Sequence, residues 1–222
     1  MRAVLLEGKK IVRALELKTP NTKQKFINNL KRSEGLAFNR KIPVGIGVAG
    51  IIKNTTVVLS PNIPYLKNFD FKKKLPLSTK IRVDNDARCF ARGEANFGAG
   101  KKFKKAFAVT IGTGVGRACV QDGAVKNIKK FEYPETWENE YQKIRAKHDD
   151  AALAIFLGRK LFALIKSYQP DALILGGGAL AKKRFFVLLK QELKRLSFSK
   201  SILRAHFKKN AGAIGAALAW QS

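Results

Sequence analysis

The chain has 222 residues, of which 45% are hydrophobic and 27% charged, which excludes a disordered tail and allows one large or two small domains. Its 44 Lys and Arg against 16 Asp and Glu give a formal net charge of +28. These basic residues are mostly Lys, spread in short groups along the chain, which predicts a solvated surface that binds nucleic acid only non-specifically.

Cys89 and Cys119 have no CxxC or Cys/His spacing, which predicts two buried free thiols. No apolar run approaches the ~20 residues that span a bilayer, and the N-terminus lacks a signal-peptide pattern. We therefore expect a cytoplasmic protein without a membrane partner.

The first part of the chain predicts alternating strands and helices. Apolar periodicity and turn residues predict a hairpin over 2–17, a helix capped by Thr22, strands at 43–48, 57–59 and 81–84, and a helix over 87–96.

A second series of elements begins near residue 106. It comprises strands at 106–111 and 117–121, an Asp122-Gly123 hairpin turn, a helix over 149–168 opened by Asp149, a strand at 172–175, a basic helix ending near 196, a short strand near 202, and a helix over 211–220. This second series of strands and helices predicts two α/β domains, 1–103 and 104–210, with the C-terminal helix 211–222 packing back on the first.

Two glycine-rich turns follow predicted strands, Gly112-Thr113-Gly114 within residues 110–116, and Gly176-Gly177-Gly178. Glycine lets backbone N–H groups approach phosphate oxygens closely, but a hairpin or strand-to-helix turn without a ligand has the same pattern. Gly-Lys-Ser/Thr does not follow either turn, and a strand follows Gly116, so P-loop and dinucleotide-binding folds are excluded.

Asn85 and Asp86 follow the strand predicted at 81–84, at the position where ligands bind in open α/β sheets. Asn and Asp are also favoured helix caps, so these two residues alone are compatible with a capping role or a catalytic one.

Six segments, read in order, resemble the ROK family of sugar kinases, repressors and related proteins, and the resemblance covers nearly the whole chain. The matching segments are GIGVAG at 45–50 (with Ala49 for the usual Pro), SPNI at 60–63, DNDA at 84–87, RGE with FGAG at 92–100, TIGTGVG at 110–116, and LILGGGA at 173–179 with AGAIGAA at 211–217.

The resemblance implies a two-domain actin-like ATPase (ribonuclease H-like) α/β fold and phosphorylation of a sugar hydroxyl by ATP, with Mg²⁺ as cofactor. The first domain would be the sugar side and the second the nucleotide side, and family members are commonly homodimers. The implied roles are Asp86 as general base; Gly47, Gly50, Asn62 and Asn85 as sugar-binding residues; Gly112, Thr113 and Gly114 at the phosphates; and Gly176, Gly177 and Gly178 at the adenosine.

Two departures from the family pattern limit this assignment. The DxGGT loop that opens family members is missing before Met1, which implies an N-terminally incomplete fold; we expect Met1 to be an internal residue, the alternative being true loss of the loop. The ExGH sugar-binding segment and the Cys-rich zinc site are also missing between Gly123 and Asp149, so the second domain is expected to be shortened, with no zinc and no protein ligand for a metal.

Glu132, Glu135 and Glu138 are possible replacements for the lost sugar ligand, although we expect each of them to be a solvated surface carboxylate. His148 is predicted to be a surface residue at a helix entry, and His206 one at a strand end. Two alternatives to an active hexose or N-acetylhexosamine kinase remain open at this point: a non-catalytic sugar- or nucleotide-binding regulator, and a degenerate kinase.

Overall fold

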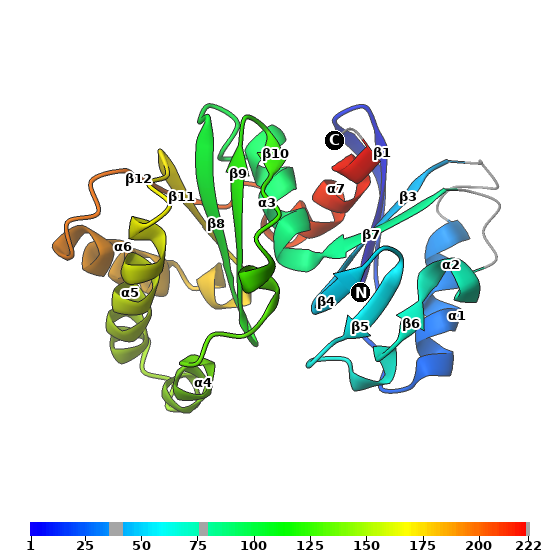
Figure 1. Cartoon of the computed structure of the whole chain (residues 1–222), viewed down its shortest axis with the longest axis horizontal. Helices are drawn as coiled ribbons and strands as arrows, with labels where there is room; N and C mark the ends of the chain where they lie inside the picture. The colour runs from blue at the N-terminus through cyan, green and yellow to red at the C-terminus, as the bar shows by residue number, and fades with distance from the viewer. Residues whose placement is uncertain (36–41, 76–79, 221–222) are drawn as a thin grey trace. The chain divides into compact units, whose positions relative to one another are not determined.

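A computed structural model describes residues 1–35, 42–75 and 80–220 (Figure 1). It separates into two compact units, Met1–Gly93 with Asn210–Ser222, and Glu94–Lys209. The chain passes from the first unit to the second within helix α3 (Asp86–Asn96).

Within the described residues, the first unit contains three small sheets and four α-helical segments. Its remaining elements, in chain order, are β1 (Arg2–Glu7), β2 (Lys10–Glu16), α1 (Lys23–Glu34), β3 (Val44–Val48), β4 (Ile51–Lys53), β5 (Thr56–Leu59), β6 (Phe69–Asp70), α2 (Phe71–Lys74), β7 (Ile81–Asn85) and α7 (Ala211–Ala217).

Local sequence signals set several of these boundaries. The predicted hairpin is confirmed: β1 and β2 pair antiparallel, and Gly8 takes a φ of 59° in the turn. Thr22 caps α1 as predicted, because its hydroxyl accepts a hydrogen bond of 3.4 Å from the Lys25 N–H. The core beneath α1 is aromatic, with the Phe69 and Phe71 ring centroids 5.0 Å apart in an edge-to-face arrangement and Phe26 packed on both.

β3 and β7 form the parallel pair that carries the candidate site of this unit. Val48 lies opposite Asn85 in the register, so both strands end at the same edge. α7 packs on β3 so closely that a Cβ added to Gly45 would lie 1.8 Å from the Ala216 carbonyl oxygen. The expected C-terminal helix is therefore part of the first unit, while residues 221–222 of its predicted span lie outside the described residues.

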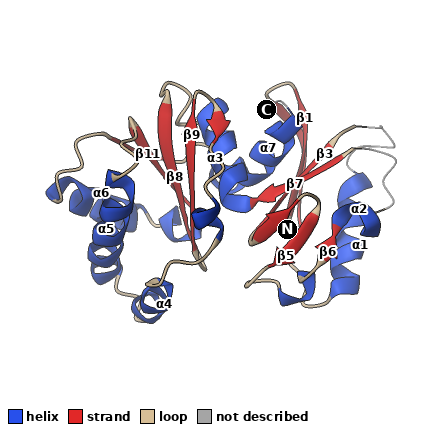
Figure 2. Ribbon diagram, viewed as in Figure 1, coloured by secondary structure: helices blue, strands red, loops and turns tan. Residues whose placement is uncertain are grey.

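The second unit is a five-stranded sheet in the order β10-β9-β8-β11-β12, with helices beside it (Figure 2). Its elements are β8 (Lys105–Ile111), β9 (Val115–Gln121), β10 (Ala124–Val125), α4 (Glu138–Ala146), α5 (Asp150–Lys166), β11 (Ala172–Gly176), α6 (Lys183–Arg195) and β12 (Ser201–Arg204).

The sheet is mixed: β8, β11 and β12 run parallel, whereas β9 and β10 pair antiparallel. α5 and α6 pack side by side and share one apolar core with β8, β9 and β11 (Figure 1). The predicted Asp122-Gly123 turn and the predicted Asp149 cap are both confirmed; Asp149 accepts the Ala151 N–H at 2.9 Å. Cys89 and Cys119 are buried free thiols, as expected.

Three short elements of the first unit, β4, β6 and α2, and helix α4 of the second were not predicted. Each of the first three has at most four residues, and α4 is mostly polar, so none shows a strong apolar period. Over the described part of the chain, no helix is both long and apolar enough to cross a bilayer.

Candidate functional site

Three consecutive polar residues stand where β7 passes into α3, and the structure gives each a different environment. Asp84 is held in ion pairs with Arg88 (Nε 2.7 Å) and Arg92 (Nη2 2.6 Å), and the nearly buried Arg92 also donates to the Gly215 carbonyl at 3.2 Å. Asp84 is thus tied to α3 and, through Arg92, to α7. Its charge is compensated by two guanidinium groups.

Asn85 caps α3 and joins it to the turn after β3. Its side-chain oxygen accepts the Ala87 N–H at 2.9 Å and the Arg88 N–H at 3.3 Å, while its amide donates to the Gly50 carbonyl at 2.9 Å. The side chain is only 7% exposed. The capping role that its residue type allows is therefore present.

Asp86, the first residue of α3, is different from both neighbours. Its side chain is exposed, and it makes no ion pair with any residue that the structure describes; one carboxylate oxygen accepts the adjacent Ala87 N–H at 2.9 Å. Protein atoms nevertheless crowd the carboxylate and reduce its hydration, and this desolvation raises the pKa of Asp86 against the lowering effect of the Ala87 hydrogen bond. A water-accessible carboxylate with a raised pKa is a suitable proton acceptor.

The end of β3 and the turn after it bring Gly47 and Gly50 next to the junction of β7 and α3. Gly47 lies against the start of α3, since a Cβ added to it would lie 3.1 Å from the Cys89 Sγ and 3.8 Å from the Asp86 Cα. Gly50 has a φ of 136°, and a Cβ there would lie 2.1 Å from the Leu59 carbonyl oxygen. The buried Ser60 hydroxyl donates to the Ala49 carbonyl at 2.6 Å, which links this turn to the segment carrying exposed Asn62.

In the second unit, both predicted glycine turns lie at the carboxyl ends of neighbouring parallel strands. Gly112-Thr113-Gly114 connects β8 to β9, and the Gly112 N–H closes the turn on the Gly114 carbonyl at 2.9 Å. Gly176 ends β11 opposite Thr110. Gly177 has a φ of 99°, and a Cβ there would lie 2.4 Å from the Ile111 carbonyl oxygen, so only glycine allows these two turns to lie together.

A buried ionic cluster supports the first turn, and sequence reasoning missed it. Arg117 on β9 is 1% exposed, and its Nη1 lies 3.7 Å from a Glu135 carboxylate oxygen and 3.6 Å from one of Glu138. The expectation of solvated carboxylates is wrong for these two residues, whose side chains are 15% and 19% exposed. Desolvation raises the pKa of Glu138, against the lowering effect of Arg117.

The missed cluster has one signal in the sequence. Val115, Arg117 and Cys119 share one face of β9, and Val115 and Cys119 belong to the core. An arginine at the middle position of such a triplet must be buried, and a buried guanidinium requires carboxylate or carbonyl partners.

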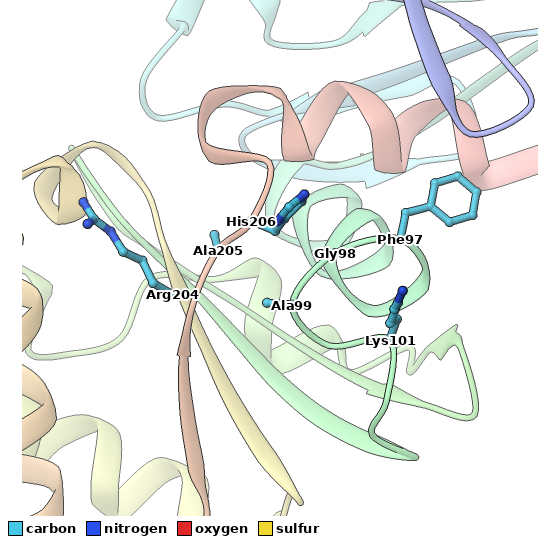
Figure 3. Close-up of a pocket in the computed structure, with 7 residues that line it drawn as sticks. All are labelled: Phe97, Gly98, Ala99, Lys101, Arg204, Ala205 and His206. Carbon is cyan, nitrogen blue, oxygen red and sulfur yellow. The ribbon is translucent and has the colours of Figure 1, made fainter.

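A cavity of about 460 Å³ lies beside the carboxyl end of β12 and is shown in Figure 3. Lys101, Arg204 and His206 line it together with the backbone of the Gly98 turn. Arg204 points away from the other two side chains (Figure 3) and donates to the Ala181 carbonyl at 3.0 Å. His206 is exposed after the end of β12, as predicted, and His148 is exposed before α5.

The described residues contain no group of three or more His, Cys, Asp or Glu side chains placed to hold a metal ion. Magnesium commonly keeps most of its ligands from water and substrate phosphates, so a protein cage is not required for a nucleotide-borne Mg²⁺.

Comparison with known proteins gives one family and a consistent fold. The sequence model of the ROK family matches residues 3–127. A glucokinase of Streptomyces coelicolor is 32% identical over 119 residues, 51% of this chain and 37% of the relative, and an N-acetylgalactosamine kinase of Shewanella sp. is 34% identical over 82 residues, 36% of this chain and 27% of the relative. The chain thus matches well under half the length of these relatives.

Among solved structures, a ROK family glucokinase of Streptomyces griseus in complex with glucose and AMPPNP superposes with a TM-score of 0.80 at 21% identity, covering 99% of this chain and 95% of that chain. At this identity the likeness concerns the fold alone. It confirms the predicted α/β fold of the actin-like ATPase type.

Proposed function

Because the chain belongs to the ROK family, we propose that it transfers the γ-phosphoryl group of ATP to a sugar hydroxyl, with Asp86 as the general base. The curated relatives include glucokinases and N-acetylhexosamine kinases, so we propose a hexose or an N-acetylhexosamine as the acceptor. The first unit would bind the sugar and the second the nucleotide.

The observation that carries this proposal is the contrast between Asp84 and Asp86. Both carboxylate oxygens of Asp84 are already occupied by ion pairs with Arg88 and Arg92. Asp86 keeps an exposed carboxylate at the end of the same strand, without an ion pair among the described residues. A base that accepts the hydroxyl proton as phosphoryl transfer proceeds needs this combination of access and free charge.

Asn85 and the Gly47 to Gly50 turn would orient the sugar. Asn85 uses its oxygen and one amide N–H within the protein, which leaves its second amide N–H for a sugar hydroxyl. Asn62 is exposed on the neighbouring segment and can both donate and accept. A rigid polar lining of this kind would hold the acceptor hydroxyl toward Asp86.

The second unit would bind ATP through backbone groups. The Gly112-Thr113-Gly114 turn, of which Thr113 is exposed, fits phosphate oxygens, because the Thr113 and Gly114 amides and the Thr113 hydroxyl can donate hydrogen bonds. Gly176, Gly177 and Gly178 fit the adenosine side. Bound MgATP supplies the phosphoryl group and part of the charge neutralisation.

A coupled ADP-release assay over a panel of hexoses and N-acetylhexosamines tests the proposal. We expect sugar-dependent turnover, which Asp86→Asn should reduce by roughly 10²- to 10⁴-fold. Asp122→Asn is the matched control, since Asp122 lies in a hairpin turn at a φ of 51°, where Asn is equally suitable.

Turnover in Asp86→Asn equal to that of the control variant would rule out Asp86 as the base. Sugar binding by calorimetry in a wild-type chain that shows no turnover with any sugar would instead favour the regulator or the degenerate kinase.

A further inference from the structure

Two carbonyl groups of the Gly112-Thr113-Gly114 turn accept hydrogen bonds from side chains of one helix. The Tyr141 hydroxyl donates to the Gly112 carbonyl at 2.6 Å, and the Gln142 side-chain amide donates to the Thr113 carbonyl. Both donors are consecutive residues of α4. The Tyr141 side chain is fully buried, and desolvation raises its pKa, which keeps the hydroxyl protonated as a donor.

These two bonds fix the direction of the next two N–H groups. In a planar trans peptide the C=O and N–H point in opposite directions, and the described chain has no cis peptide. With the Gly112 and Thr113 carbonyls directed at α4, the N–H groups of Thr113 and Gly114 are directed away from it. Neither donates a hydrogen bond to any residue that the structure describes.

Two consecutive N–H groups of a turn that no described residue uses are free to donate together to an anion. Their alignment depends on α4, because a glycine-flanked turn has little conformational preference of its own. We propose that Tyr141 and Gln142 are positioning residues that hold this turn ready for the phosphates of a nucleotide, an inference that rests on the nucleotide-binding role proposed above.

α4 is itself fixed by the Arg117 cluster. Arg117 donates to the Tyr133 carbonyl at 2.6 Å and pairs with Glu135, both in the segment before α4, and with Glu138, the first residue of the helix. Glu138 also reaches the turn, since its Oε2 lies 3.6 Å from a Cβ built on Gly114. The buried guanidinium on β9 thus fixes the N-terminal end of α4, and the next turn of the helix carries Tyr141 and Gln142.

The test measures phosphate-dependent binding separately from adenosine binding. Calorimetry with ADP, ATP and adenosine is done on the full chain as wild type, Tyr141→Phe, Gln142→Met and the control Tyr133→Phe, whose side chain is 55% exposed. Loss of one hydrogen bond to the turn should weaken ADP and ATP binding by roughly five- to tenfold and leave adenosine binding unchanged. A general loss of structure would weaken all three ligands together.

The remaining outcomes show whether the positioning role alone has failed or the nucleotide-binding proposal as well. If wild type binds ADP and both α4 variants bind it equally well, Tyr141 and Gln142 do not position the turn, and nucleotide binding stands without them. If adenosine binding falls as far as ADP binding in Tyr141→Phe, the role is structural and the inference is wrong. If wild type binds neither adenosine nor ADP, the nucleotide-binding proposal fails, and this inference fails with it.

Discussion

Glu94 offers the sharpest test of the second unit, because a fully buried carboxylate there accepts three backbone N–H groups. Oε2 accepts from Ala99 and His206, each at 2.9 Å, and Oε1 accepts from Phe207 at 2.8 Å. These bonds join the end of α3 to the segment after β12. We predict that Glu94→Gln lowers the stability of the protein substantially.

The magnitude follows from the bonds that an amide cannot make. The Gln oxygen can replace Oε2, but its NH₂ group then faces the Phe207 N–H, so one charge-assisted bond is lost and a buried donor is left unsatisfied. Charge-assisted bonds contribute about 1.5–3 kcal/mol and neutral ones about 1 kcal/mol, so the loss should total roughly 2–4 kcal/mol. That corresponds to a fall in Tm of roughly 5–15 °C.

Thermal and urea unfolding, followed by circular dichroism, measure this difference. Glu140→Gln is the matched control, because Glu140 is exposed on α4 and the same change should alter stability by less than about 0.5 kcal/mol. The reasoning is refuted if Glu94→Gln unfolds within about 0.5 kcal/mol of that control.

Four further predictions concern single residues. Sugar-dependent kcat/KM should fall on the acid side with an apparent pKa above the ordinary aspartate value of about 3.9, because a proton on Asp86 blocks the base and desolvation raises its pKa; a profile that stays flat down to pH 4 would contradict this. Since the folded pKa of Asp86 lies above the unfolded one, its ionisation removes stability as pH rises between the two, and Asp86→Asn should have a higher Tm than wild type at neutral pH. Gly177→Ala should lower the free energy of unfolding, measured in urea, by more than about 2 kcal/mol, because a Cβ at a φ of 99° meets the Ile111 backbone. Its control is Gly212→Ala in α7, where nothing lies within 4 Å of the added Cβ, and this change should leave the free energy of unfolding equal or raise it. Asp149→Ala should lower the free energy of unfolding by about 1 kcal/mol through loss of the α5 cap, and no change in the urea midpoint would exclude the capping role.

The long elements could be predicted from the sequence because their own periodicity specifies them. α5 carries apolar residues at helical spacing behind an Asp cap, and β11 is a wholly apolar strand between a helix and a glycine turn. The positions of Asn85 and Asp86 at a strand-to-helix junction could be predicted for the same reason. Their pattern combined two local signals, a strand end and a cap.

The partners of these residues could not be predicted from local patterns. The bond from Asn85 to the Gly50 carbonyl joins residues 35 positions apart, and the contact of Tyr141 with Gly112 joins residues 29 positions apart. Neither α4 nor the acidic residues around it have a strong apolar period, so Glu135 and Glu138 resemble surface residues in sequence. Their burial depends on Arg117, which tertiary structure places beneath them.

The same dependence explains why Asp84 and Asp86, two residues apart and chemically identical, have different expected roles. Strand alternation and the helix that follows direct Asp84 toward Arg88 and Arg92, one and two turns into α3. Both guanidinium groups pair with Asp84, whereas Asp86 is exposed and makes no ion pair with any described residue. Ion pairing of Asp84 with both arginines thus leaves Asp86 as the carboxylate of this junction that is available to act as the base.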